Sequence, residues 1–557
     1  MEKIWLASYP PGVPAEVDVT RYNSIGELFE QSADRWGDRI AYYCMGGELS
    51  FRNTAVLARQ FASYLQNELK LPKGTRIALM MPNVLQYPIS LFGAMLGGYV
   101  VVNCNPLYTP RELEYQLQDS GAQAIVVLEN FAQTVEAVIE RTAVRHVIVA
   151  SLGDLLGSLR GSLINFVVRH VKKKVPAWSL PKAVRFKAAL AAGDRKAFVP
   201  VEVSLQDLAF LQYTGGTTGK AKGAMLRHAN PLANVLQAHA WVQKALREGE
   251  ETVITALPLY HIFSLTANCI YFFMIGASNV LIPNPRDIAG FVKELSLRPF
   301  TVITGVNTLF NALLNHPDFS KLDFSGLHLS LGGGMATQKA VADRWQAVTG
   351  DMLLEAYGLT EASPALCINP VTLTAFNGAI GLPLPSTEVS LRDESGLEVA
   401  AGRPGELCAR GPQVMAGYWN APDETAKVMT ADGFLRTGDV ATMDEAGFLR
   451  VVDRMKDIIV VSGFNVYPNE IEDVVASHPG VLEVAAIGVP DPRTGEAVKL
   501  FVVRRDPELS AEEILRHCKK DLTRYKLPHS VEFRDSLPKT NVGKILRRAL
   551  REAAEKG

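Results

Sequence analysis

Residues 213–223 read YTGGTTGKAKG, a polar stretch that combines glycines with three threonines and two lysines. The apolar segment 207–212 (DLAFLQ) predicts a strand before it, and we expect a helix to begin near Asn230 after it. Glycines let backbone N–H groups turn toward an anion, while threonine hydroxyls and lysine ammonium groups add donors and charge. A flexible surface loop is the commoner structure for a Gly/Thr-rich segment, but two lysines and an apolar lead-in strand favour a phosphate-binding cradle.

The loop does not follow the Walker A pattern, G-x-x-x-x-G-K-[ST]. The dipeptide at 219–220 is the one place where that pattern could be anchored. There, Thr214 stands where the first glycine belongs, and Ala221 stands where the magnesium-binding hydroxyl belongs. The sequence therefore predicts a nucleotide cradle of another type.

Composition describes a soluble globular chain of several domains. A length of 557 residues predicts two or three domains, and 48% hydrophobic with 21% charged residues is typical of such proteins. A net charge of −1 argues against nucleic acid as a partner. The N-terminus lacks a signal-peptide core, and no apolar run reaches the ~18 residues of a membrane span. Six cysteines without a C-x-x-C pair suit reduced thiols in the cytoplasm.

The first 210 residues alternate between strand and helix signals. Thr109 and Pro110 mark one helix start as cap and first helical residue. Such alternation predicts an α/β fold with doubly wound, mostly parallel sheets. The expected strands are 41–44, 76–81, 100–104, 123–128 and 146–150.

A second nucleotide signal is the pentapeptide YGLTE at 357–361, which follows a strand-like segment at 352–355. The Tyr357 ring can stack on a base, the Thr360 hydroxyl can reach a phosphate, and the Glu361 carboxylate is a hard ligand for Mg²⁺. The glycines at 332–334 follow another predicted strand, where backbone could approach a flat ligand closely. Alone each motif is weak, but paired with the loop at 213–223 they indicate a nucleotide site.

From Ile458 onward the chain predicts a small α+β domain. Its tail, SLPKTNVGKILRRALREA, places Lys544 after a glycine and before a basic helix. From residues alone, the charged run DRMKD at 453–457 is a solvated turn, and the basic tail could equally contact nucleic acid or a membrane.

All of these motifs together resemble the adenylate-forming enzymes, which include acyl-CoA synthetases, luciferases and peptide-synthetase adenylation domains. The resemblance covers essentially the whole chain and is strongest to bacterial long-chain fatty acid–CoA ligases. Four stretches look specific to that group: NPLYTPRELEYQL from Asn105, LPLYHIF from Leu257, GVNTLFNALL from Gly305 and VSGFNVYPNEIEDVV from Val461. The cation Lys220 departs from the neutral residue expected inside the loop.

The resemblance implies a large N-terminal domain (1–453), a hinge (454–457) with Lys456 as its pivot, and a mobile C-terminal domain (458–557). It implies catalytic roles for Lys544, Lys222 and Glu361, with Glu361 also as the Mg²⁺ ligand. The ATP-binding residues would be Thr214, Gly215, Gly216, Thr217, Thr218, Gly219, Lys222, Gly333, Gly334, Tyr357, Gly358, Thr360, Asp439 and Arg454. The acyl and CoA sites would comprise His261, Phe263, Gly305, Gly332, Ser462, Gly463 and Phe464. For any single side chain of the His261–Phe263 segment, ordinary core packing is an equal alternative.

The implied reaction needs Mg²⁺, with ATP and CoA as co-substrates. Attack of a fatty carboxylate on the α-phosphorus of ATP gives an acyl adenylate and pyrophosphate, and a thiol then displaces AMP. The alternatives are a carrier-protein acceptor, oxygen as in luciferases, an acid of another chain length or an aryl acid, and a lipid-binding protein without activity. A P-loop ATPase would instead release ADP and phosphate.

Residues 155–178, LLGSLRGSLINFVVRHVKKKVPAW, predict a basic amphipathic helix with a terminal Trp. Such a helix could lie on an anionic membrane, or it could be a cover helix whose lysines face water. The expected location is therefore the cytoplasm, with peripheral contact at the inner face of the cytoplasmic membrane as one hypothesis. A homodimer is implied by the resemblance alone.

Overall fold

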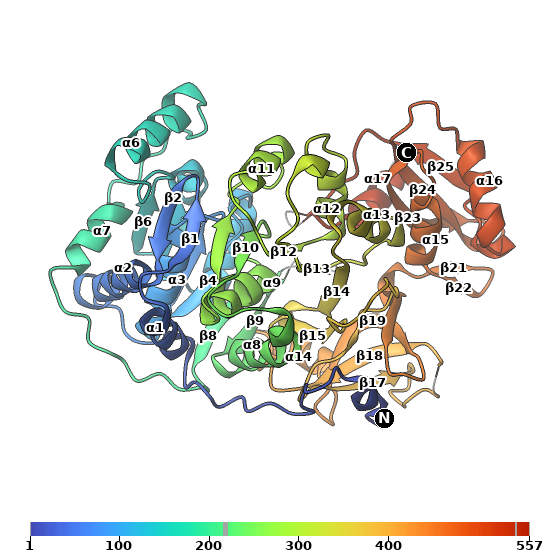
Figure 1. Cartoon of the computed structure of the whole chain (residues 1–557), viewed down its shortest axis with the longest axis horizontal. Coiled ribbons are helices and arrows are strands. Elements are labelled where there is room, and N and C mark those ends of the chain that lie inside the picture. Colours follow the sequence, from blue (N-terminus) through green and yellow to red (C-terminus); the bar gives the residue numbers. More distant parts are fainter. Residues whose placement is uncertain (1, 215–220, 401, 541–542, 556–557) are drawn as a thin grey trace.

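The computed structural model describes residues 2–214, 221–400, 402–540 and 543–555, and Figure 1 shows their arrangement. A seven-stranded sheet has the order β7-β6-β5-β3-β4-β8-β9. All neighbours in it are parallel except β8 and β9, which form an antiparallel pair. Its strands are β3 Arg76–Met80, β4 Val100–Asn103, β5 Ala124–Leu128, β6 His146–Ala150, β7 Val184–Arg185, β8 Leu208–Thr214 and β9 Lys222–Arg227.

A nine-stranded sheet has the order β16-β15-β14-β13-β12-β10-β11-β1-β2. Its central strands run parallel, and antiparallel strands close both edges. The doubly wound α/β prediction is confirmed by these two sheets. The strands are β1 Ile40–Cys44, β2 Gly47–Ser50, β10 Thr252–Thr255, β11 Ser278–Leu281, β12 Val302–Gly305, β13 Leu329–Gly333, β14 Leu353–Gly358, β15 Ala365–Ile368 and β16 Leu382–Pro383.

Helix α3, Gln86–Leu96, is central to the large domain, since all eleven of its residues are buried. Phe92 on this helix stacks on Phe29 of α1, with ring centroids 4.2 Å apart, and packs on Phe273 at 5.1 Å. Aromatic side chains that are far apart in the sequence thus pack together in one apolar core. The other helices of this domain are α1 Ile25–Trp36, α2 Phe51–Ser63, α4 Pro110–Ser120, α5 Ala132–Glu136, α6 Ser158–Phe166, α7 Phe186–Gly193, α8 Ala229–Val242, α9 Ile262–Ser264, α10 Phe272–Met274, α11 Ile288–Leu295, α12 Asn307–Leu314, α13 Lys339–Thr349 and α14 Pro422–Val428.

Two smaller sheets complete the molecule on the right of Figure 1. An antiparallel sheet contains β17 Glu388–Arg392, β18 Gly405–Arg410, β19 Leu435–Met443 and β20 Leu449–Arg454. After the 3₁₀ turn η10, Met455–Asp457, the small C-terminal domain has its own five-stranded sheet and apolar core. Its elements are β21 Ile459–Val461, β22 Phe464–Val466, α15 Pro468–Ala476, β23 Val481–Asp491, β24 Gly495–Arg504, α16 Ala511–Asp521, β25 Ser530–Phe533 and α17 Arg547–Ala554.

The segment 155–178 is helical over a shorter stretch than predicted. Helix α6 continues into a π-helical turn, η5 Val167–Val171, and ends there. Lys173 has a φ of 49°, in the left-handed region, which ends the helix before Trp178. Trp178 lies outside the helix, with the Arg185 guanidinium 5.1 Å from its ring. The predicted helix through Trp178 is therefore wrong beyond Val171.

Two further properties concern the whole described chain. All six cysteines are free and buried, namely Cys44, Cys104, Cys269, Cys367, Cys408 and Cys518. In the part of the chain that the structure describes, no helix has the length and apolar character needed to cross a membrane.

Candidate active site

The site forms where β12, β13 and β14 end side by side. The register pairs Gly305 with Gly332, and Gly333 with Ala356. A Cβ on Gly333 would lie 3.0 Å from the Phe263 ring and 2.9 Å from the Ala356 carbonyl oxygen, so only glycine lets these groups approach. Gly334 follows with a φ of 79°, which favours glycine for conformational reasons as well.

Asp439 is the centre of a hydrogen-bonded group on the edge of this site. The Tyr357 hydroxyl donates to Asp439 Oδ2 at 2.6 Å, and Arg454 Nε lies 3.3 Å from Asp439 Oδ1. The strands β19 and β20 hold Asp439 and Arg454 as register partners. Burial raises the pKa of Tyr357, and the nearby Asp439 carboxylate raises it further, so the phenol remains a neutral donor. The arrangement presents a fixed carboxylate, a ring face and a cation together.

Lys544 reaches the same site from the small domain. Its Cε lies 3.3 Å from where a Cβ on Gly334 would stand, and the Thr308 hydroxyl of α12 donates to the Gly543 carbonyl at 2.9 Å. Burial and, to a smaller extent, the charge of Arg454 lower the pKa of Lys544 to about 8, although Asp439 and Glu361 act in the opposite direction. The ammonium group is therefore subject to the charges of Arg454, Asp439 and Glu361, which are predicted residues of the nucleotide site.

His261 and Phe263 form the apolar side of the site. His261 caps helix α9, and its Nδ1 accepts a hydrogen bond from Phe263 N at 3.4 Å. Burial and, to a smaller extent, the charge of Lys544 lower the pKa of His261 to about 3, so the imidazole is neutral. The helix continues as a π-helical segment, η7 Leu265–Tyr271, before α10. The helical segment that follows His261 is therefore irregular in its middle.

Glu361 is held in place by a residue that sequence reasoning missed. The Tyr418 hydroxyl donates to Glu361 Oε1 at 2.7 Å, and the Lys222 ammonium lies 5.0 Å from the Tyr418 ring centroid. Lys222 also forms an ion pair with Glu424. Tyr418 lies in the stretch GELCARGPQVMAGYWN, which stands out by its glycines and aromatics but does not by itself indicate a contact with Glu361.

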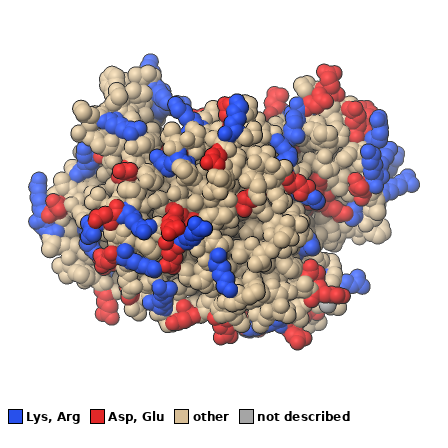
Figure 2. Space-filling model, in the orientation of Figure 1, with Lys and Arg blue, Asp and Glu red and all other residues tan. Residues whose placement is uncertain are grey.

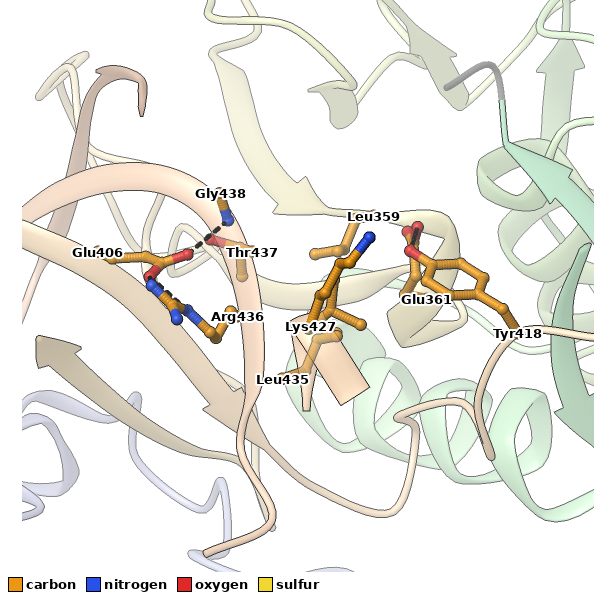
Figure 3. Close-up of a pocket in the computed structure, with 10 residues that line it drawn as sticks. Leu359, Glu361, Glu406, Tyr418, Lys427, Leu435, Arg436, Thr437 and Gly438 are labelled. Atoms are coloured by element: carbon orange, nitrogen blue, oxygen red, sulfur yellow. Dashed lines mark hydrogen bonds and ion pairs between the residues drawn. The ribbon is translucent and has the colours of Figure 1, made fainter. Parts of the chain in front are cut away.

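Glu361 and Tyr418 also line a cavity of about 260 Å³. Figure 3 shows them on one side, the Glu406–Arg436 ion pair on the other, and the Lys427 side chain between. Arg436 Nη2 lies 2.6 Å from Glu406 Oε2, and Glu406 Oε1 accepts from Gly438 N at 3.2 Å. This opening next to Glu361 therefore carries charges of both signs.

Glu361 does not belong to a metal-binding cluster of three or more protein side chains within the described part of the chain. No group of three or more His, Cys, Asp or Glu side chains that could hold a metal occurs in residues 2–214, 221–400, 402–540 and 543–555. Mg²⁺ in nucleotide-dependent enzymes is commonly bound by one or two carboxylates together with substrate phosphates. A single carboxylate beside a phosphate site therefore fits an ion that arrives with ATP.

The remaining predicted residues lie at different distances from this centre. Ser462, Gly463 and Phe464 form an exposed turn of the small domain, where the Phe464 ring stacks on Tyr525 at 4.9 Å, and the structure does not place them with Lys544. Lys456 lies in η10, and burial lowers its pKa to about 8. Thr214 and Lys222 are register partners on β8 and β9. Gly215, Gly216, Thr217, Thr218 and Gly219 lie outside the described residues.

Fold and site together define an adenylate-forming enzyme. The AMP-binding enzyme family matches residues 29–419, the AMP-binding enzyme C-terminal domain matches residues 470–544, and the chain belongs to this family. It is 58% identical over 554 residues to a long-chain-fatty-acid–CoA ligase of Escherichia coli O157:H7, covering 100% of this chain and 99% of that protein.

Solved structures show the same architecture. The anthranilate CoA ligase AuaEII with anthranoyl-AMP aligns at a TM-score of 0.86 and 26% identity, over 97% of this chain and 99% of that one. ATP-bound MatB of Rhodopseudomonas palustris aligns at 0.81 and 27% identity, over 96% and 99%. Apo MatB of the same organism aligns at a TM-score of 0.73 and 28% identity, over 96% of this chain and 99% of that one.

Proposed function

We propose that the chain converts long-chain fatty acids to acyl-CoA through an acyl-AMP intermediate, with release of pyrophosphate and AMP. The observation that carries the proposal is the approach of Lys544 to Gly334, directly after β13, at a place where the carboxylates of Asp439 and Glu361 raise the pKa of the lysine against the effect of burial. The 58% identity over the full length of curated long-chain-fatty-acid–CoA ligases supports the acyl substrate.

In the proposed first step, charge is the main barrier, because a carboxylate must approach a polyanion. Asp439 would accept the ribose hydroxyls, with Arg454 beside it, and Tyr357 would offer its ring face to the base. Lys222, Thr360 and the loop 214–219 would bind phosphate oxygens. Lys544 would offset the negative charge that gathers at the α-phosphate. Mg²⁺ held by Glu361 would supply further neutralisation of the phosphates.

The proposed acyl site lies on the other side of the glycine strands. Phe263 contacts Gly333, and a Cβ on Gly305 would lie 2.7 Å from the Phe310 ring. The absence of side chains at Gly305 and Gly332 therefore leaves space between the strands and the proposed acyl site. His261 is half-buried and its lowered pKa keeps the imidazole neutral, which suits a group that faces an apolar tail rather than a titrating catalyst.

In the proposed second step, the small domain rotates so that the thiol can reach the carbonyl carbon. We infer domains at 1–453 and 458–557 with a hinge at 454–457, since β20 ends at Arg454 and a new sheet begins with β21 after η10. Lys456 would carry the backbone change. The turn of Ser462, Gly463 and Phe464 is free to approach the pantetheine, because Phe464 is exposed.

A second property is supported by the helix α6 and the turn η5. Leu159 is 89% exposed, and Leu163, Phe166 and Val171 are also exposed on the same projection. The following Lys172, Lys173 and Lys174 are exposed cations. Figure 2 shows this projection at the upper left as mainly uncharged, with Lys and Arg at its margins. We propose that the protein is cytoplasmic and that α6 and η5 contact the anionic inner face of the membrane. We also propose a homodimer, from the family resemblance alone.

The membrane proposal predicts binding to vesicles that contain anionic lipid and not to neutral ones. Replacing Lys172, Lys173 and Lys174 by Gln should weaken sedimentation with anionic vesicles, and Leu159→Ser with Phe166→Ser should weaken it further. Unchanged binding in all variants would contradict the proposal.

The activity test measures pyrophosphate and AMP release with acids from acetate to oleate, with and without CoA. The proposal expects CoA-dependent turnover that is greatest for long chains. Adenylate formation that ignores CoA would indicate another acceptor, and ADP release would indicate an ATPase. A maximum at short or aryl acids would retain the reaction and change the substrate.

A further inference from the structure

Arg547 forms an ion-pair cluster at the point where the two domains are joined. Its Nε and Nη2 atoms bind both carboxylate oxygens of Glu472, at 3.0 and 2.7 Å. Its Nη1 atom lies 3.4 Å from Asp453 Oδ1 and 3.4 Å from Asp457 Oδ2. The Asp453 side chain is completely buried. One guanidinium therefore holds carboxylates on both sides of Lys456.

The partners of Arg547 divide into two groups at Lys456. Asp457 and Glu472 follow Lys456 in the chain, as does Asn469, whose Oδ1 accepts from Arg547 at 2.6 Å. Asp453 precedes Lys456, and its Oδ2 accepts from Asn469 N at 2.9 Å. A rotation about Lys456 would keep the first group together as part of the small domain. The same rotation would separate Asp453 from both Arg547 and Asn469.

The chain links Arg547 directly to Lys544. Arg547 is the first residue of α17, three positions after Lys544, so at most about 10 Å of extended backbone separates their Cα atoms. Leu546 N donates to the Pro538 carbonyl at 2.8 Å, and the Thr540 N–H donates to the Lys544 carbonyl at 2.7 Å. These bonds join residues 538–540 to residues 544–546, so that Lys544 and Arg547 belong to the same hydrogen-bonded part of the small domain.

We propose that Arg547 is a positioning residue that, through its contact with buried Asp453, stabilises the orientation of the small domain in which Lys544 faces the nucleotide site. The inference rests on the proposed role of Lys544. After rotation, Arg547 retains Glu472 and Asp457, so no cation is left unpaired in either orientation. The orientations then differ at this cluster by one long ion pair and two hydrogen bonds, from Asn469 N to Asp453 and from Asn469 Nδ2 to the Val452 carbonyl at 3.4 Å, a difference small enough to be reversed in every catalytic cycle.

The test measures the two half-reactions separately in single-turnover experiments. Adenylation is followed as pyrophosphate release from ATP and oleate without CoA, and thioester formation is followed from supplied oleoyl-AMP with CoA. We expect Arg547→Ala and Asp453→Asn each to slow adenylation by about tenfold and to leave thioester formation unchanged or faster. The double variant should be no slower than Arg547→Ala alone, because both changes remove the same contact.

Arg551→Ala is the matched control. Arg551 lies one helical turn further along α17 and binds Asp457 at 2.6 Å, a contact that does not cross Lys456. It should leave the ratio of the two half-reactions within about twofold of the wild-type ratio. Asp453→Asn, which nearly conserves shape, provides the test if Arg547→Ala does not fold. Equal loss of both half-reactions, or the same selective loss in Arg551→Ala, would overturn the proposal.

Lys544→Ala in the same assays separates the two hypotheses. If Lys544→Ala leaves adenylation intact, the proposed role of Lys544 fails. If Lys544→Ala abolishes adenylation while Arg547→Ala and Asp453→Asn do not slow it selectively, only the positioning role of Arg547 fails.

Discussion

The packing surface of helix α3 and the boundary between the two domains differ in the chemistry of their contacts. All eleven residues of α3 are buried, and Phe92 packs on Phe29 and Phe273. At the domain boundary the described contacts include a threonine hydroxyl, an asparagine amide and an arginine. Thr308 donates to Gly543 O at 2.9 Å, and Asn311 donates to Leu482 O at 3.0 Å.

This difference in chemistry indicates how readily each of the two interfaces can separate. Apolar burial stabilises without direction, and separating such surfaces exposes them to water at a high cost. Hydrogen bonds and ion pairs can be exchanged for water at small net cost, so an interface built from them can open and close. We therefore expect the large domain to remain intact, and the proposed domain rotation would open the boundary next to Lys544.

The largest expected effect is on the packing surface of helix α3. Phe92→Ala removes a fully buried ring and should lower the free energy of unfolding by about 3–5 kcal/mol. Chemical denaturation followed by fluorescence measures this loss. Leu159→Ala is the control, since that side chain is exposed and should change the stability by less than about 0.5 kcal/mol. Equal losses in both would show that α3 is not the core described above.

Lys544→Ala should act on chemistry and not on stability. We expect adenylation to fall by about 10²–10³-fold, the usual effect of removing one group that stabilises developing charge. Thioester formation from supplied acyl-AMP should persist. Lys539→Ala is the control from the same segment, because Lys539 binds Glu483 of the small domain instead of facing the nucleotide site. A loss in both half-reactions would contradict the division of labour between the two orientations.

The pH dependence of adenylation follows from the same lysine. Only the ammonium form offsets phosphate charge, and burial lowers the pKa of Lys544 to about 8. The value of kcat/KM for ATP should therefore fall as pH rises through about 8, approaching tenfold per pH unit above it. The rate of thioester formation should not show this decrease above pH 8. An adenylation profile that stays flat up to pH 10 would show that Lys544 remains charged in the free enzyme.

The smallest expected effect concerns a single hydrogen bond at the boundary between the two domains. Thr308→Val removes the donor to Gly543 O and should slow adenylation about fivefold, equivalent to about 1 kcal/mol. Thr308→Ser keeps the hydroxyl and should restore most of the rate. Thermal unfolding of the large domain should be the same in both variants, and a shift in Thr308→Val alone would assign the bond to stability instead.

Much of the fold could be predicted from local sequence signals. The strand at 146–150 and the capping residue Thr109 match the structure, because apolar runs and caps act within a few residues. The antiparallel sheet β17–β20 and the end of the helix at Val171 were not predicted. The first depends on long-range pairing, and the second on one backbone angle at Lys173.

The site shows the same limit. The YGLTE motif identified Glu361 as a candidate, and the family resemblance added Asp439 and the role of Lys544; in the structure both carboxylates act on the pKa of Lys544. Their roles remain predictions. The contacts of Tyr418 with Glu361 and of Arg547 with Asp453 join residues 57 and 94 positions apart. No local pattern reports such a pairing, since either partner alone has the character of an ordinary surface or core residue.

The burial of all six cysteines has a consequence for an enzyme whose proposed second substrate is itself a thiol. An acyl adenylate reacts with whichever thiolate reaches it first. Burial raises the pKa of Cys44 and Cys269 to about 12, and of Cys408 and Cys518 to about 11. Burial also raises the pKa of Cys104 and Cys367. The buried cysteines are therefore kept from being acylated by the activated intermediate. They do not compete with the thiol of CoA.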